Sequence, residues 1–209
     1  TDPAITTARG YLDGEATVAI VERIADWANE GILAPNMLLQ GFDSWGSFVN
    51  GALAARQDGP WFANWLEANH PNVDAGYALM PHEAGLDSIS VVGGENIALL
   101  RSSGQKEAAW TFARFMLSAE TQAQFAAVGQ IPVVMSAASA DVLAGSKYYP
   151  VYLEQLLTAQ ARTPHPGYQR LEEIAQDAFV KAITGQVTPR AALEEAARLI
   201  DEAVLQAAE

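Results

Sequence analysis

The sequence predicts an α/β fold, and three observations support this class. Half of the 209 residues are hydrophobic and 18% are charged, which is the composition of a folded globular protein. Apolar residues recur at helical spacing near both ends of the chain. Between these ends, continuous apolar runs stop at proline or glycine, which is typical of buried strands. The length fits one large domain or two small ones, so the domain count stays open.

Two helices are predicted in the first seventy residues. The first spans residues 15–30, with Asp13 placed to cap its start and Gly31 to end it. The second spans residues 61–68 and follows Gly59-Pro60, which puts proline at a favoured first helical position.

Strands are predicted in the middle of the chain. Residues 75–80 form a continuous apolar run, which indicates a strand covered on both faces. Residues 88–92 and 96–100 are two further strand segments, separated by the pair Gly93 and Gly94. The glycine pair indicates either a plain turn or a bulge where another group approaches the backbone closely.

Helices dominate the chain after residue 103. Two short ones follow each other, with a second start signal at Ser118 and an end at Gly129. A third is predicted over residues 148–160. The last two are the clearest in the sequence and are separated by Gly185 and the start signal Thr188-Pro189.

The charge and the missing cysteine exclude several classes of function. The formal net charge is -13 at pH 7, so a phosphate backbone would repel the chain and no nucleic-acid partner is expected. The absence of cysteine excludes disulfides, thiolate catalysis and cysteine-based zinc sites. No run of 18 apolar residues exists, so no membrane-spanning helix is expected.

No motif for catalysis or for a cofactor has the required spacing. His70, His82 and His165 lie far apart, so we expect no metal site, and neither a P-loop nor G-x-G-x-x-G is present. The glycines around Ser44 do not fit a nucleophile elbow. Paired acids on the last two helices are typical of solvated faces, although hydrolysis by two carboxylates stays open. The sequence therefore favours binding over catalysis, with no cofactor.

Eight segments, in order, resemble a known family. They are residues 13–32, 48–54, 59–61, 77–81, 93–99, 106–115, 118–125 and 129–132. They include the segment KEAAWTFARF at 106–115 and the glycine pair at 93 and 94, and it is their shared order that carries the resemblance. Together they resemble the extracellular solute-binding proteins of ABC-type sugar importers.

The resemblance implies a type II-like periplasmic binding protein fold, similar to maltose-binding protein. In that fold two α/β lobes are joined by crossing strands and hold a solute between them. The chain looks like the C-terminal portion, with residues 1–92 and 138–209 in the second lobe. Residues 97–132 would cross to the first lobe and add helices to it, while the core of that N-terminal lobe is expected to be absent.

The resemblance also implies a function and partners. The expected role is reversible capture of a carbohydrate or polyol and its delivery to the transmembrane subunits of an ABC permease. The expected location is extracytoplasmic, in a periplasm or as a cell-surface lipoprotein. The helices at 105–128 would leave an apolar face uncovered, which predicts a dimer, a swap or an accompanying chain.

The resemblance points to eight candidate solute contacts. They are Trp45, Trp61, Gly93, Gly94, Glu95, Asn96, Arg162 and Tyr168. Trp61 is the strongest, because a flat ring can stack on the apolar face of a sugar. The two glycines would let the backbone approach the solute, and the two residues after them would supply polar contacts.

Other interpretations remain open at this point. Trp61 could pack in the core, and Tyr168 could be an ordinary surface residue, whereas Trp65 and Trp110 are assigned to the core because their helical neighbours are apolar. The alternative functions are a glycoside-active hydrolase with paired carboxylates and a scaffold or sensor that kept the fold.

Overall fold

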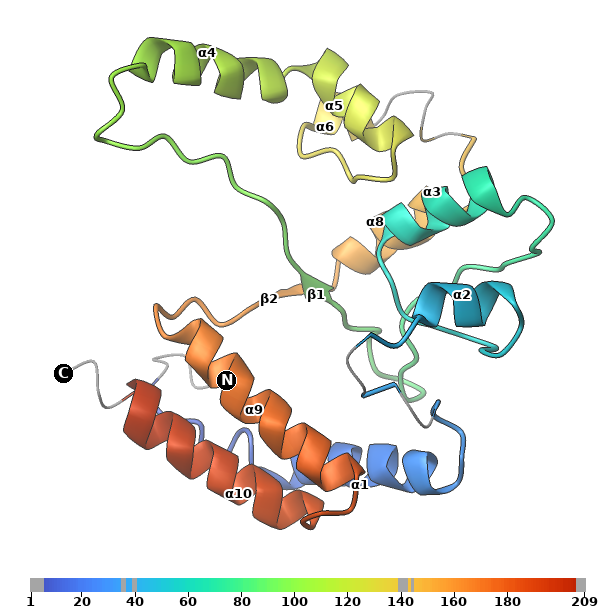
Figure 1. Ribbon diagram of the computed structural model, residues 1–209, viewed down its shortest axis with the longest axis vertical. Coiled ribbons are helices and arrows are strands. Elements are labelled where there is room, and N and C mark those ends of the chain that lie inside the picture. Colours follow the sequence, from blue (N-terminus) through green and yellow to red (C-terminus); the bar gives the residue numbers. More distant parts are fainter. Residues whose placement is uncertain (1–5, 35–36, 39–40, 139–142, 144, 206–209) are drawn as a thin grey trace. The chain divides into compact units, whose positions relative to one another are not determined.

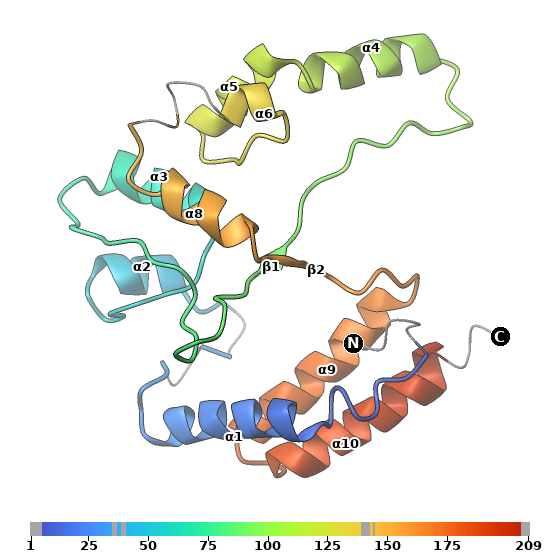
Figure 2. The same ribbon diagram turned by 180° about the vertical axis from the view of Figure 1, so that it is seen from behind.

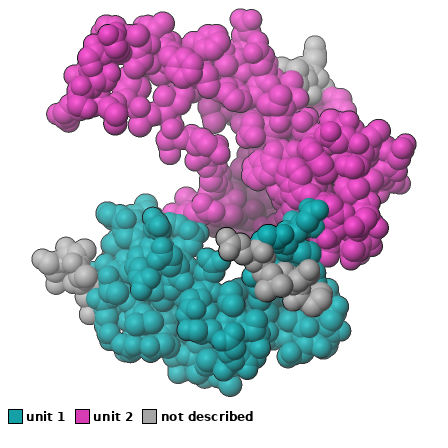
Figure 3. Space-filling view, in the orientation of Figure 1, with its two compact units in different colours: residues 1–44, 163–209 teal, residues 45–162 magenta. Residues whose placement is uncertain are grey.

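The chain forms two compact units. The computed structural model describes residues 6–34, 37–38, 41–138, 143 and 145–205. Unit 1 comprises Thr1–Ser44 and Thr163–Glu209, and unit 2 comprises Trp45–Arg162 (Figure 3). Within the described ranges, no helix combines the length and the hydropathy that crossing a bilayer would require.

Unit 1 is a layer of helices from the two ends of the sequence (Figure 1). Its elements are α1 (Glu15–Asn29), α9 (Tyr168–Ile183), α10 (Pro189–Ile200) and the π-helical turn η1 (Asp201–Leu205). Helix α9 packs along α10, and α1 packs against both. The shared core is made of Val18 and Val21 from α1, Ile174 from α9, and Leu193 and Ile200 from α10. The helices predicted for these segments are confirmed.

Local signals explain where these helices begin and end. Gly31 and Gly185 take positive φ angles of 73° and 71° just beyond α1 and α9, a conformation that glycine adopts at low cost. The Thr188 side chain caps α10 by accepting a hydrogen bond from the backbone N–H of Ala191. The predicted cap at Asp13 is wrong, because its carboxylate accepts from the N–H of Gly10 instead.

A buried carboxylate joins the two ends of unit 1. Asp201 is 5% exposed and accepts hydrogen bonds from the Thr7 hydroxyl (2.7 Å) and the Ala8 N–H. Removing a buried acceptor leaves its donors unpaired. We therefore expect Asp201→Ala to lower the free energy of unfolding by about 1–3 kcal/mol, measured by chemical denaturation. Its neighbour Glu202 is the matched control, because its ion pair with Arg198 is exposed and worth less than about 1 kcal/mol.

Unit 2 contains short helices and one small parallel pair of strands (Figures 1 and 2). The helices are α2 (Ser44–Val49), α3 (Pro60–Asn69), α4 (Lys106–Met116), α5 (Ala119–Ala127), α6 (Met135–Ala138) and α8 (Tyr149–Leu156), and the strands are β1 (Val91–Val92) and β2 (Gln160–Ala161). Val91 pairs with Gln160, and Val92 with Ala161. The helix predicted over 148–160 is therefore shorter than expected and is followed by a strand.

The core of unit 2 forms where α3, α5 and α8 meet. Its buried residues include Ala63 from α3, Ala126 from α5 and Tyr149 from α8. The Tyr149 hydroxyl donates to the carbonyl oxygens of Ala126 and Gln130, so the buried hydroxyl is satisfied. Helix α5, which the sequence assigned to a crossing segment, thus shares a core with α3.

The strands predicted around residue 90 form only in part. Residues 75–80 and 96–100 have no strand partner in the part of the chain that the structure describes, and only Val91–Val92 pairs. The expectation that residues 75–80 are covered on both faces is wrong, since Gly76 and Ala78 are exposed. Strand structure requires a neighbouring backbone, and β2 supplies two residues of it.

Side chains hold this extended region in place instead of a sheet. Gln155 on α8 accepts a hydrogen bond from the N–H of Met80 (2.8 Å) and donates to the carbonyl of Ser88 (3.1 Å). The Ser88 hydroxyl donates back to the Met80 carbonyl (2.8 Å). The N–H of Met80 and the carbonyl of Ser88 are therefore bound by a side chain of α8.

The compact units divide the chain at 44/45 and 162/163. The sequence placed its boundaries elsewhere, with residues 1–92 and 138–209 in one lobe and 97–132 crossing to another. The lobe assignment concerns a larger, two-lobed fold, so these boundaries do not test it and it stays a prediction.

Two half-buried tyrosines make unit 2 sensitive to alkaline pH. Burial, with a smaller contribution from the Glu67 carboxylate, raises the pKa of Tyr77 from 10.0 to about 12, and burial also raises the pKa of Tyr152 to about 12. Between pH 10 and pH 12 the folded chain keeps tyrosine hydroxyl protons that the unfolded chain loses. The free energy of unfolding therefore falls as the pH rises from 10 to 12. Urea titrations across this range should show the fall. Tyr77→Phe should make it shallower, and an unchanged slope would contradict the assignment.

Candidate functional site

Trp61 lies near the start of α3 with its ring folded over Gly59. A methyl group added at Gly59 would lie 2.2–2.4 Å from three carbons of the indole, so the ring rests directly on the glycine backbone. Trp61 is nevertheless 48% exposed. One side of the ring is therefore supported by the chain, and much of the remainder is accessible to a ligand.

A second glycine supports the first turn of the same helix. Gly129 has a φ of +87°, and a Cβ there would lie 2.8 Å from the Cβ of Asn64 and 2.9 Å from the Cα of Trp61. Both the backbone conformation and the close approach favour glycine. The turn that ends α5 is thus packed against the backbone that carries Trp61.

Asp58, just before α3, forms several hydrogen bonds and an ion pair. Its carboxylate accepts hydrogen bonds from the N–H of Gly59 (2.7 Å) and from Trp45 Nε1 (2.9 Å), and it forms an ion pair with Arg56. Its backbone carbonyl accepts from the Tyr152 hydroxyl (3.0 Å). The Arg56 and Asp58 side chains are 11% and 12% exposed, so this ion pair is largely shielded from water.

Trp45 belongs to an aromatic cluster around this ion pair. Its ring lies 5.0 Å from that of Phe62 and 4.8 Å from that of Trp65, measured between centroids. The Arg56 guanidinium lies 4.0 Å from the centre of the Phe62 ring, a cation–π distance. Trp65, assigned to the core from the sequence, is half-buried in this cluster.

The predicted glycine pair lies in an open segment after β1. Gly93, Gly94, Glu95 and Asn96 are all exposed. A Cβ added to either glycine would meet no atom within 4 Å, so no contact within the described residues requires glycine there. The backbone of this segment is accessible for a ligand to approach.

The parallel strands bring Arg162 to the same place. Val92 is the register partner of Ala161, so Gly93 and Arg162 each follow the last paired residue of their strand. Parallel strands leave the ladder at the same end, which puts both residues beside each other. Arg162 is exposed. Sequence reasoning selected both residues separately and did not anticipate that β1 and β2 would join them.

Tyr168 belongs to unit 1, whereas the other candidates belong to unit 2. It is the first residue of α9, is half-buried, and its hydroxyl donates to the Glu172 carboxylate at 3.2 Å. The structure therefore brings together Gly93 and Arg162 in one place, and in another it puts Trp45 on Asp58 and Trp61 on the adjacent Gly59. Asp58, Arg56 and Gly59 were missed as site residues.

Trp110 is not in the core. It is 53% exposed, and Phe112 and Phe115 on the same helix are 56% and 59% exposed. Ala113 is the buried residue of α4. The prediction that Trp110 packs inside is wrong, because helical spacing of apolar residues shows that a face is apolar but not what covers it.

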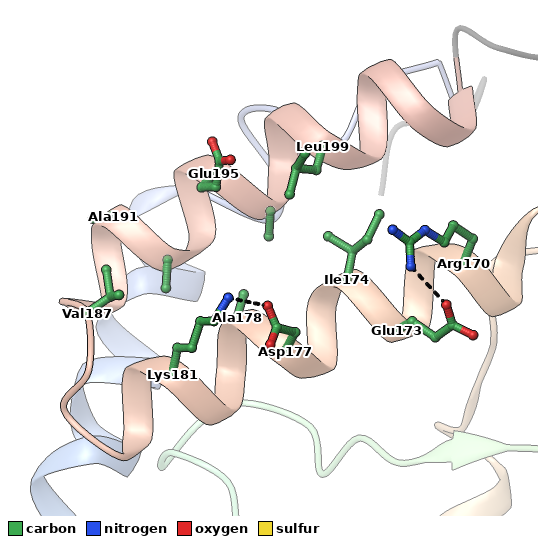
Figure 4. A pocket seen from close by; sticks show the side chains of 12 residues that line it. Arg170, Glu173, Ile174, Asp177, Ala178, Lys181, Val187, Ala191, Glu195 and Leu199 are labelled. Atoms are coloured by element: carbon green, nitrogen blue, oxygen red, sulfur yellow. Dashed lines mark hydrogen bonds and ion pairs between the residues drawn. The ribbon is translucent and has the colours of Figure 1, made fainter.

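A groove of about 310 Å³ lies between α9 and α10 (Figure 4). None of the predicted site residues lines it. Figure 4 shows two ion pairs along α9, Arg170 with Glu173 (3.0 Å) and Lys181 with Asp177 (2.6 Å), and Glu195 on α10 pairs with Arg198 (2.6 Å). The groove is thus lined by apolar residues and by charges that already have partners. Across the described ranges, no cluster of three or more potential metal-ligating side chains exists.

Comparison with protein families shows which family this chain belongs to. The profile of the bacterial extracellular solute-binding proteins matches residues 4–148, which is more than half of the sequence. The chain belongs to this family. The resemblance found in the sequence is confirmed. The family binds solutes outside the cytoplasm, which agrees with the expected location and with binding rather than catalysis.

Solved structures of solute-binding proteins share the fold. An ABC transporter solute-binding protein from Thermotoga lettingae, bound with alpha-D-tagatose, has a TM-score of 0.79 and 24% identity over 94% of this chain and 52% of its own. The sugar-binding protein MalE of Xanthomonas citri has a TM-score of 0.77 and 22% identity, over 90% of this chain and 49% of its own. The cyclic alpha-maltosyl-1,6-maltose binding protein of Arthrobacter globiformis has a TM-score of 0.69 and 20% identity, over 93% of this chain and 50% of its own.

The chain spans about half the length of those proteins. The predicted fold, a type II-like periplasmic binding protein of which only part is present, is therefore confirmed. The described residues contribute a partial sheet to it, formed by β1 and β2. The eight candidate contacts stay predictions.

Proposed function

We propose that this protein is the carbohydrate-binding component of an ABC importer. It captures a sugar or polyol reversibly in a cleft between two lobes and delivers it to the transmembrane subunits of a permease. The observation that carries the proposal is the Trp61 ring, supported by Gly59 and 48% exposed, in a chain of the solute-binding family. The sugar-binding proteins that share the fold support it.

The chemistry of the exposed residues suits a sugar. A sugar ring has apolar faces and polar edges, so its site needs a flat aromatic surface together with hydrogen-bonding groups. Trp61 supplies the aromatic surface. Arg162, Glu95 and Asn96 are exposed around the ends of β1 and β2, a different place from Trp61, and we propose that they supply the donors and acceptors for the sugar edges when the cleft closes.

Binding without bond cleavage distinguishes this role from the hydrolase alternative. Membership of a solute-binding family favours reversible binding. Incubation with a panel of aryl glycosides should release no aglycone, and turnover that follows the purified protein would support the hydrolase. A scaffold or sensor of the same fold would bind no member of a sugar panel. Attachment to the cell surface by a lipid remains part of the proposal.

The decisive experiment is a thermal-shift screen of the full-length protein against monosaccharides, oligosaccharides and polyols, followed by calorimetry on each hit. A ligand at one hundred times its Kd stabilises the folded state by about 2.7 kcal/mol, which raises the melting temperature measurably. We expect at least one sugar or polyol to do so. If none binds although the protein is folded, the proposed function is wrong.

The exposed face of α4 and α5 is proposed as a surface for association. Phe112, Phe115 and Val128 are each more than half exposed, within the predicted 105–128 region. Apolar patches of this kind tend to find a partner. Light scattering of this 209-residue chain should show a dimer, a swap or a complex with another chain, which Phe112→Ser with Phe115→Ser should dissociate. A monomer at high concentration would count against this surface.

A further inference from the structure

We infer that Asp58 and Gly59 are positioning residues that hold the Trp61 ring in the orientation in which it meets the solute. This inference rests on the proposed function, because it assigns a role to residues behind the proposed sugar contact. It also changes the role of Trp45, which acts on Asp58 rather than on the solute.

The Asp58 carboxylate is fixed from several sides. One oxygen accepts from the Gly59 N–H at 2.7 Å, and the other accepts from Trp45 Nε1 at 2.9 Å. Arg56 neutralises its charge, and the Arg56 guanidinium is itself held over the Phe62 ring at 4.0 Å. Hydrogen bonds to a charged acceptor in a shielded site are strong and directional. The backbone at Gly59 therefore has little freedom to rotate.

The Trp61 ring packs directly against the fixed backbone of Gly59. The indole occupies the space in which every other residue would carry its Cβ, at 2.2–2.4 Å from that position. Only glycine leaves the space free. Gly59 is also the residue immediately before α3, and its carbonyl accepts a turn-type hydrogen bond from the N–H of Phe62, three residues on (3.1 Å). The position of the helix start and the position of the ring are thus set by the same residue.

The consequence for binding is preorganisation. A tryptophan that is free to rotate must be ordered when a sugar stacks on it, and this ordering reduces affinity. The ring of Trp61 is ordered before the solute arrives, with Gly59 behind it and Gly129 against its backbone. Trp45 contributes by donating its only side-chain N–H to Asp58, which leaves that N–H unable to bond a sugar.

The test compares Gly59→Ala and Asp58→Asn with Gly104→Ala, all in the full-length protein. Gly104 is the matched control, because it lies in the same unit and a Cβ there meets no atom within 4 Å. The first readout needs no sugar: fluorine NMR of protein labelled with 5-fluorotryptophan. The Trp61 resonance is identified by its loss in Trp61→Phe. We expect it to shift or broaden in the two test variants and to stay unchanged in the control.

The second readout is calorimetric affinity for the best sugar or polyol from the screen. We expect Gly59→Ala to weaken binding by about tenfold, as displacement of a stacking residue would. In a Trp61→Ala background the same change should cause no further loss, because the ring to be positioned is gone. A purely structural role for Gly59 would weaken binding in both backgrounds.

The outcomes separate the two proposals. If no sugar binds the parent protein, the proposed function fails while the fluorine spectra still decide whether Gly59 and Asp58 position the ring. If sugar binds but Gly59→Ala leaves both the Trp61 resonance and the affinity unchanged, the positioning role is overturned and the function stands.

Discussion

Replacing Trp61 by alanine in the full-length protein is expected to weaken sugar binding by about ten- to fifty-fold. A sugar ring on the exposed side of the indole would bury on the order of 50–100 Å² of apolar surface, which at roughly 25 cal/mol per Å² contributes about 1–2.5 kcal/mol. Isothermal titration calorimetry of parent and variant measures the difference. The melting temperature should change little, because much of the side chain is already exposed.

Trp110→Ala serves as the comparison in this 209-residue chain. The sequence placed Trp110 in the core, which would make the variant melt at a much lower temperature. Because Trp110 is 53% exposed, we expect the free energy of unfolding to change by about 0.5 kcal/mol or less. An unchanged sugar affinity in the Trp61 variant, or a large fall in its melting temperature, would mean that Trp61 is a packing residue.

The helices could be predicted because their signals are local. Pro189 after Thr188, and Gly185 at the preceding helix end, act through the backbone of a few neighbouring residues. The strands could not be predicted as reliably, because a strand depends on a partner that lies elsewhere in the sequence. Residues 96–100 have a strand-like composition, yet no neighbouring backbone pairs with them in the described part of the chain.

The exposed residues of the candidate site could be selected from the sequence, but the residues that hold Trp61 in place could not. Trp61 could be selected because the resemblance implied a stacking residue at a helix start after Gly59-Pro60. The role of Asp58 depends on Trp45, thirteen positions earlier, and on Tyr152 from α8. Contacts over such separations leave no periodic pattern. The one available signal was an acidic residue directly before the glycine that precedes the helix.

The largest loss of stability is expected from the core of unit 1. Leu193 on α10 is 2% exposed and packs within the cluster shared by α1, α9 and α10. Leu193→Ala removes buried methyl groups and leaves a cavity, so the free energy of unfolding should fall by about 2–5 kcal/mol. For a chain of this size that corresponds to a fall in melting temperature of about 4–20 °C. Chemical denaturation and calorimetry measure both quantities.

Leu199→Ala on the same helix is the matched control. Leu199 is 36% exposed and lines the groove between α9 and α10 (Figure 4), so less of its surface is buried on folding. The same chemical deletion should therefore cost about 1 kcal/mol or less. Equal losses of unfolding free energy for the two variants would contradict the packing of α10. They would mean that Leu199, on the groove side, is as buried as Leu193 in the core of unit 1. A small loss at Leu193 with a large one at Leu199 would mean that the helix is rotated about its axis.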